Sequence, residues 1–418
     1  MRLANVILAV QAIAWLAFQY HATGFVPIAD DDTASYLDEM SLSSYRTLGY
    51  PLFLRVVGVD AMPLLTALVF VAAVLVFAGA LAQLCGCPVS SAIVASPLFY
   101  LVIPDCPVNA LLTDHLCFSM EVLTIAFALR TLAPGARPRD WTLLGLCLAT
   151  SYHIRPAALV MVGLVPILWC LLGWWYQPRS RLARVVGIST LPLILYCSLR
   201  WAVIGHFGLV SLGGMSQMVV AGQLLTPEVA ATLPESQRVL AEDIIARLSA
   251  APGYRSPVMG RYDVNAGLLC EQPGIIFGVA VDAAKAHGLS TVPDIDAELA
   301  ALAKAILWRC PVRYLVWCLK ASRRVAMDGL SGVFLVPMAL CLLAAHAPVV
   351  RRRAAFRPDL VRLLGIVFVI AFWFSLLSAA LVMVANCPIG RYVAPAFAFW
   401  PMVPTAGLLL LLWKEKVQ

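Results

Sequence analysis

Three adjacent aspartates are the residues in this chain best suited to acid–base chemistry. Asp30, Asp31 and Asp32 follow the first apolar segment. A carboxylate within hydrogen-bonding distance can take the proton of an attacking hydroxyl or amine, so the triplet is a candidate general base. The alternatives are a divalent metal site on these carboxylates and a solvated loop in which Asp32 precedes a helix that begins at Thr33. We take Asp32, Asp31 and Asp30, in that order, as candidate catalytic residues.

Four arginines lie in short segments that the topology below places outside the cytoplasm, where basic residues are less common. They are Arg46, Arg55, Arg155 and Arg391. Each could form a salt bridge with a nearby aspartate or extend to lipid headgroups. Because the planar guanidinium fork suits phosphate, four together near an acidic triplet favour a shared site for a phosphate-bearing ligand. We assign donor-phosphate binding to Arg46, Arg155 and Arg391.

Asp114 lies near the outer end of an apolar segment, where an unpaired carboxylate is costly. It is either one partner of a structural salt bridge or a second acid of the site. His115 and His153 have no third ligand at metal-binding spacing, and helix packing is the alternative for both. We predict no dedicated metal site and no certain cofactor. The candidate substrate-binding residues are Tyr36, Tyr50, Asp114, His153 and Tyr392.

The composition indicates a membrane protein. Of 418 residues, 61% are hydrophobic and 13% are charged, and the mean hydropathy is +0.87. Soluble domains are near 45–50% apolar and about 25% charged. These values exclude a soluble enzyme, a disordered scaffold and a DNA-binding module, and we expect no nucleic-acid partner despite the net charge of +7. The first apolar segment lacks a small-x-small cleavage pattern, so we expect it to be a retained span.

The hydropathy pattern predicts an all-α polytopic membrane protein with about ten transmembrane helices. The predicted cores are 4–20, 61–84, 91–104, 110–130, 141–152, 156–176, 186–204, 329–348, 361–384 and 394–413. With ten spans and a cytoplasmic N-terminus, the C-terminus is cytoplasmic too. All the basic clusters, near residues 130–139, 179–184, 351–357 and 414–416, then fall on the cytoplasmic side, where such residues collect. Segments 91–104 and 141–152 are short and could be broken helices.

Three regions follow from this topology. Residues 1–204 form an N-terminal transmembrane module, whose first external loop, 21–60, carries the catalytic acid. Residues 205–328 form a small, mostly helical external domain, with helical patterns at Pro234–Leu248 and Asp294–Arg309. Residues 329–418 hold the C-terminal transmembrane helices, preceded by an external juxtamembrane helix near Trp308–Tyr314. One or two disulfides could form among Cys106, Cys270, Cys310 and Cys387, which fall in segments placed outside the cytoplasm.

Several motifs resemble those of GT-C-type membrane glycosyltransferases, including protein mannosyltransferase-like and aminoarabinose-transferase-like enzymes. Asp32-Thr-Ala-Ser-Tyr36 and Arg46-Thr-Leu-Gly-Tyr-Pro-Leu-Phe-Leu54 resemble the first external loop of that family. Thr113-Asp114, Ile154-Arg155-Pro156 and Gly390-Arg391-Tyr392-Val-Ala-Pro395 resemble three further motifs in the same order. The resemblance covers the chain to residue 204 and again from about residue 305.

The resemblance implies a GT-C-like fold and an inverting transferase. The donor would be a polyprenyl-phosphate-linked monosaccharide, and the acceptor a glycan, a lipid or a protein. The protein would lie in a bacterial inner membrane, with its active site on the periplasmic side. Two alternatives are a transporter or flippase of a lipid-linked glycan and a non-catalytic docking protein. Transporters commonly contain internal repeats, and this sequence shows none.

Overall fold

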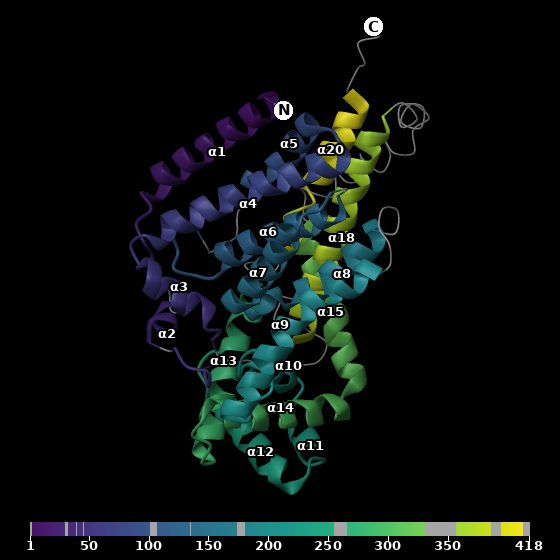
Figure 1. Cartoon of the computed structure of the whole chain (residues 1–418). Coiled ribbons are helices and arrows are strands. Elements are labelled where there is room, and N and C mark those ends of the chain that lie inside the picture. The colour runs from purple at the N-terminus through teal and green to yellow at the C-terminus, as the bar shows by residue number, and fades with distance from the viewer. Residues whose placement is uncertain are drawn as a thin grey trace.

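The structure is a computed structural model. It describes residues 2–29, 32–38, 40–44, 46–100, 107–133, 135–173, 180–254, 266–330, 357–385 and 394–412. These residues form helices and no β-strand, with one isolated parallel bridge between Ile28 and Ala110. The prediction of an all-α protein is therefore confirmed for the described residues (Figure 1).

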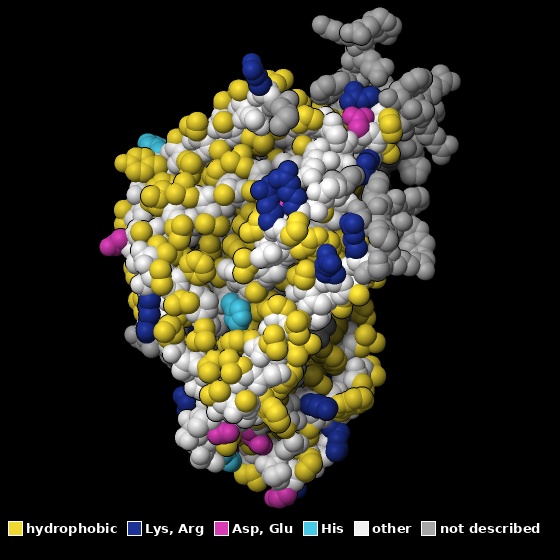
Figure 2. Space-filling model, viewed as in Figure 1, with side chains coloured by type: hydrophobic (Ala, Val, Ile, Leu, Met, Phe, Trp, Pro, Cys, Tyr) yellow, Lys and Arg dark blue, Asp and Glu magenta, His cyan; other side chains and the backbone are white. Residues whose placement is uncertain are grey.

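Six described helical segments are long and apolar enough to cross a membrane. They are α1 (Arg2–Thr23), α4 (Met62–Cys85), α6 (Asp114–Leu132), η2 with α8 (Pro156–Leu159 and Val160–Gly173), α9 (Ser180–Ile204) and α18 (Pro358–Ala385). Exposed apolar side chains along α1 and α9, such as Ile13 and Leu195, suit contact with lipid. Figure 2 shows hydrophobic side chains over much of the surface near α1 and α4.

The predicted count of ten spans is wrong for the described part of the chain. The described part of segment 91–104, residues 91–100, falls on α5 (Pro88–Ala95) and the 3-10 helix η1 (Ser96–Tyr100), which together are too short to span alone. Segment 141–152 lies within α7 (Pro138–Ile154), which has 17 residues. The described residues of segment 394–413 form η3 (Ala394–Phe397), a turn and the short α20 (Met402–Leu412). Segment 329–348 lies almost wholly outside the described residues.

Helix α6 lies at the centre of the membrane part and is largely buried. It packs against α4, α7 and α8. Phe118 of α6 contacts Phe70 of α4, Phe374 of α18 and Phe399, with ring centroids 6.0–6.5 Å apart. Because α6 is enclosed on most sides, its polar side chains must bond within the protein or face an internal cavity.

Residues 213–309 include four helices that pack around a second hydrophobic core, here called the α10–α14 unit. Its longer helices are α10 (Gly213–Gly222), α12 (Glu235–Ala250), α13 (Ala266–Ala286) and α14 (Val292–Arg309), with the short α11 (Pro227–Ala230) between α10 and α12. Buried Ile244, Ile276, Leu299 and Ile306 belong to this core. Helices α12 and α14 cover the two ranges whose patterns predict helices. The unit lies at the end of the molecule opposite the start of α1 (Figure 1).

Three further helices complete the described elements. Helices α2 (Thr33–Asp38) and α3 (Gly49–Val57) lie in the loop between α1 and α4, and α15 (Pro311–Leu330) follows the α10–α14 unit. Helix α15 packs against α18 and η3, so it connects the unit back to the membrane part.

Candidate functional site

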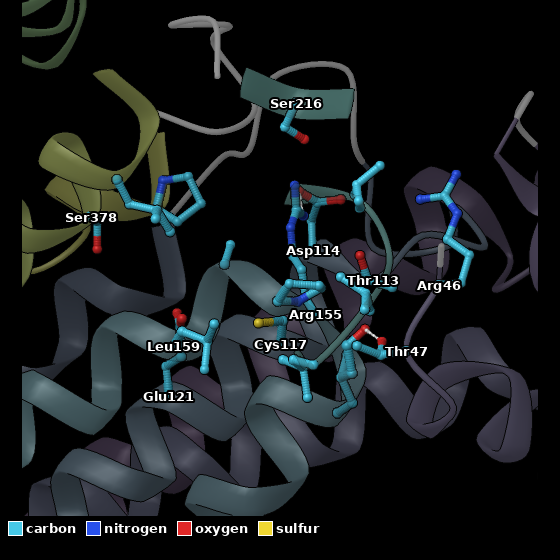
Figure 3. Close-up of a pocket in the computed structure, with 18 of the residues that line it drawn as sticks. Arg46, Thr47, Thr113, Asp114, Cys117, Glu121, Arg155, Leu159, Ser216 and Ser378 are labelled. Carbon is cyan, nitrogen blue, oxygen red and sulfur yellow. Dashed lines mark hydrogen bonds and ion pairs between the residues drawn. The ribbon is translucent and has the colours of Figure 1, made fainter. Parts of the chain in front are cut away.

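A cavity of about 440 Å³ lies where the first loop, α6, the start of η2, the start of α10 and α18 meet. One side is polar and carries Arg46, Asp114 and Arg155, and much of the rest is apolar (Figure 3). The remaining lining residues used below are Tyr36, Thr113, Cys117, Phe118, Glu121, Leu159, Ser216, Gln217, Phe374, Ser378 and Leu381. The cavity therefore has a place for a charged group beside a place for an apolar one.

Asp114 and Arg155 form an ion pair on the cavity wall. Asp114 is the first residue of α6, where the helix dipole favours a negative charge. Arg155 ends α7, because a residue before proline, here Pro156, disfavours helical dihedrals. Its backbone is extended, with φ −150° and ψ 129°. The Asp114 side chain is 2% exposed and that of Arg155 is 17% exposed, so the arginine is the more accessible partner.

A second ion pair joins Arg46 to Asp32 in the first loop. The guanidinium Nη2 of Arg46 lies 2.6 Å from Oδ1 of Asp32, and its Nε and Nη1 donate to the hydroxyls of Ser35 and Tyr36. The guanidinium also stacks on the Tyr36 ring, 4.6 Å from its centroid. Arg46 lines the cavity, whereas Asp32 is not among the lining residues. An arginine from each pair therefore forms part of the cavity wall.

Tyr36 links the two ion pairs. Its hydroxyl lies within hydrogen-bonding reach of the Thr113 side chain, and the charges of Arg46, Asp32 and Arg155 all act on it. Burial raises the pKa of Tyr36 above its usual value, although the two arginines oppose this shift. The hydroxyl therefore stays protonated at neutral pH and can donate a hydrogen bond toward the cavity.

Backbone contacts bring the first loop onto α6 and α7. Ile28 donates to and accepts from the segment before α6, through Asn109 and Leu111, at 3.0 and 2.9 Å. The hydroxyl of Thr47 donates to the carbonyl of Ile154 at 3.0 Å, next to Arg155. Thr47 and Ile154 are 107 residues apart in the chain. These contacts explain why residues distant in sequence meet at one cavity.

Arg200, near the end of α9, fixes the other side of the first loop. Its side chain is buried, and its guanidinium donates to the carbonyls of Leu42 and Gly208 and to the hydroxyl of Ser211. Leu42 belongs to the first loop, whereas Gly208 and Ser211 lead into α10. One buried arginine thus holds together two segments that contribute to the cavity wall.

Asp296 of α14 anchors the start of α10. Its Oδ1 accepts hydrogen bonds from the backbone N–H groups of Gly214 and Met215, at 2.7 and 3.0 Å. Burial raises the pKa of Asp296, and the two backbone donors partly oppose this shift. Since Ser216 and Gln217 follow directly and line the cavity, this anchor links the α10–α14 unit to the site.

The predicted site residues divide into three groups. Tyr36, Arg46, Asp114 and Arg155 line one cavity, and Asp32 pairs with one of them. Tyr50 packs edge-on against Tyr36, and His153 packs against Tyr152 and Tyr196; neither lines the cavity. Their proposed contact with substrate stays a prediction, and exposed Arg55 also lies away from the lining. Asp30, Asp31, Arg391 and Tyr392 lie outside the described residues.

The residues of the metal and disulfide predictions lie partly outside the described ranges. Within the described ranges, no group of three or more His, Cys, Asp or Glu side chains could hold a metal ion. The metal alternative rests partly on Asp30 and Asp31, which are outside those ranges. Cys310 is buried with a free thiol, whereas Cys106 and Cys387 lie outside the described residues and the Cys270 side chain is not described.

Glu121 is the cavity residue that sequence reasoning missed. Asp114, Cys117 and Glu121 are spaced three and four residues apart, so they lie on one face of α6. All three line the cavity. The available signal was an acidic residue seven positions into an apolar span, since such residues are rare and mostly face a cavity or a partner.

No family model matches this sequence, and no curated protein or solved structure shows significant similarity to it.

Proposed function

We propose that this protein is a membrane glycosyltransferase that moves a monosaccharide from a polyprenyl-phosphate donor to a glycan, lipid or protein acceptor. The observation that carries the proposal is the convergence of Arg46, Asp114 and Arg155, from three separate segments, on one cavity with an apolar wall. A phosphate and a hydrocarbon chain joined in one molecule match both halves of this cavity.

The two arginines would bind the donor phosphate. A guanidinium has five N–H donors, so Arg155 can hold Asp114 and still donate to a phosphate oxygen. Tyr36 and Thr113 add neutral hydroxyl donors on the same wall. Because the lipid phosphate is the leaving group, these donors would stabilise the charge that develops on it during transfer.

Asp32 would act as the base that activates the acceptor, with Asp30 and Asp31 as the neighbouring candidates. Its carboxylate is held by Arg46, which lines the cavity. A donor phosphate would attract Arg46 and loosen its ion pair with Asp32. The Asp32 carboxylate could then take a proton from the attacking group of the acceptor. Donor binding and base activation would thus be coupled through one guanidinium.

The apolar part of the cavity would take the isoprenoid chain. Phe374 and Leu381 of α18 line the wall that would hold the chain. Contacts of this kind favour a hydrocarbon over water because apolar surface is removed from solvent. They supply affinity for the lipid part of the donor.

We place this cavity on the extracytoplasmic side of a bacterial inner membrane. Arg130 lies in the last turn of α6, Arg137 and Arg139 flank the start of α7, and Arg357 precedes α18. The cavity residues lie at the opposite ends of these helices. Since cytoplasmic ends collect basic residues, the cavity end would face outward.

The test is a transfer assay with the purified full-length protein in lipid nanodiscs. Radiolabelled undecaprenyl-phosphate monosaccharides are supplied with a membrane extract, and release of undecaprenyl phosphate is measured. Asp32→Asn is expected to lower the rate by about 10²–10⁴-fold, as for loss of a general base. Arg155→Ala should weaken donor binding, while Arg55→Ala, an exposed arginine near the same loop, should leave the rate unchanged.

Two outcomes would count against the proposal. Near-normal transfer by Asp32→Asn would remove Asp32 as the base. Movement of unmodified labelled lipid across a liposome bilayer, with no sugar transferred, would favour the transporter alternative.

A further inference from the structure

We propose, on the basis of the function above, that Glu121 forms a second polar subsite in the same cavity, which binds a hydroxyl or amino group of the donor's sugar. The subsite would distinguish the glycosylated lipid from the bare lipid phosphate that remains after transfer.

Glu121 is a buried acid that faces the cavity. It is 7% exposed and lies among the residues that line the wall. Its carboxyl contacts the thiol of Cys117, one turn earlier on α6. A thiol is a weak hydrogen-bond donor, so this contact satisfies little of what a carboxyl can bind. Arg155 and Asp114 act on Glu121 from a longer range, and in the described part of the chain it has no ion pair.

Burial of such a group is costly without a partner. A carboxyl transferred from water into apolar surroundings loses hydrogen bonds whether it is ionised or protonated. Phe118 and Leu159 line the same cavity, and their apolar side chains supply no hydrogen bond to Glu121. Acidic residues kept inside membrane spans mostly serve a ligand or an ion path. A ligand hydroxyl or amine in the cavity would supply the missing donor.

The position of Glu121 fits the sugar rather than the phosphate. Asp114 and Glu121 are seven residues apart on one face of α6, which places their levels about 10 Å apart along the helix axis. Figure 3 shows Glu121 on the side of the Asp114–Arg155 pair opposite Arg46. A phosphate held by the arginines carries both the sugar and the isoprenoid chain, so the sugar would lie along the α6 wall beside Glu121 and the chain along the α18 wall.

The Glu121 carboxyl favours a ligand that places a hydrogen-bond donor beside it. A carboxyl oxygen accepts a bond from a ring hydroxyl or an amine, and a bare prenyl phosphate has neither group at that distance. Loss of the sugar on transfer would leave Glu121 without its partner again. The spent lipid phosphate would then bind more weakly than the donor, which favours its exchange for fresh donor.

Binding measurements can test this without knowledge of the natural sugar. The probes are farnesyl phosphate and farnesyl-phosphoryl glucose, mannose and glucosamine, titrated into the full-length protein in nanodiscs. For wild type, at least one glycosylated probe should bind about tenfold more tightly than farnesyl phosphate, the value of one hydrogen bond to a buried polar group. Glu121→Met, which keeps the side chain's length, should abolish this difference and leave farnesyl phosphate binding unchanged. Glu228→Gln, at an exposed site in the α10–α14 unit, is the matched control.

A labelling experiment on the wild-type protein covers the case in which Glu121→Met fails to fold. Dicyclohexylcarbodiimide reacts with protonated carboxyls in apolar surroundings, and mass spectrometry locates the adduct. The preferred glycosylated probe should protect Glu121 from reaction, whereas farnesyl phosphate should not. Equal protection by both probes would overturn the subsite.

The outcomes separate this inference from the proposed function. If no probe binds wild-type protein, the proposed function fails and the subsite falls with it. If farnesyl phosphate binds and depends on Arg155, but no glycosylated probe binds more tightly, the phosphate site stands and the Glu121 subsite is wrong. A preference for a glycosylated probe that survives Glu121→Met would also overturn it.

Discussion

Arg200 allows the sharpest test of how the cavity is held together. Its guanidinium joins Leu42 of the first loop to Gly208 and Ser211, which lead into α10. Arg200→Met removes all of these hydrogen bonds and keeps much of the apolar stem. We expect the two segments to separate more often while the helices around them stay folded.

The size of the effect follows from the groups left behind. Hydrogen bonds from a charged donor contribute about 1.5–3 kcal/mol each. Ser211 is fully buried and would lose a partner, whereas Leu42 and Gly208 are partly exposed and can bind water instead. Removal of a buried charge also relieves its desolvation. We therefore expect a net loss of about 2–4 kcal/mol in the local opening free energy.

Hydrogen–deuterium exchange measures this opening directly. A loss of about 2–4 kcal/mol corresponds to roughly 30- to 1,000-fold faster exchange of protected amides. The increase should be confined to peptides covering residues 40–48 and 206–216. Arg55→Met, an exposed arginine, is the control. Unchanged exchange in both segments of Arg200→Met would show that Arg200 does not join them.

Three further substitutions test other contacts around the site. Gly214→Ala would place a methyl group against the backbone of Asp296 and Ala300, so it should lower the melting temperature through a loss of about 1–3 kcal/mol, while Gly213→Ala, which meets no atom within 4 Å, should not. Asp296 has a raised pKa in the folded protein, so its contribution to stability is present below its ordinary value of about 4 and is lost as the pH rises through the raised value. Asp296→Asn should remove this fall in the melting temperature as the pH rises from about 4; identical profiles would contradict the assignment. Tyr36→Phe removes a hydroxyl that accepts from Arg46, and it should weaken farnesyl phosphate binding by about fivefold, for a loss of about 1 kcal/mol, in a titration.

The sequence alone was sufficient to identify a helical membrane protein. Transmembrane helices need only a run of apolar residues of the right length, a property that is local to each segment. The same local reasoning identified Arg46, Asp114 and Arg155 as charges in unusual places, and all three line the cavity. Pro156 even predicts the break that turns Arg155 out of its helix, because the restriction before proline is local too.

The count of spans was less accurate for a physical reason. Hydropathy reports how apolar a segment is, but whether the helix continues depends on its surroundings. Ser96 ends α5, and its N–H and hydroxyl bond back to that helix before a tighter 3-10 turn begins. Such an interruption is stable because neighbouring helices bury it, as they bury Leu98 and Phe99.

Only the tertiary structure decided which charges pair. Asp114 bonds to Arg155, 41 residues away, and Asp32 bonds to Arg46, 14 residues away, although the sequence offers other partners for each. These choices depend on how α6, α7 and the first loop pack, which no single segment encodes. Glu121 and Arg200 were missed for the same reason, since their roles come from a cavity and a loop contributed by distant parts of the chain. Local composition therefore determined the class of protein and its unusual charges, and long-range packing determined their partners and the cavity they share.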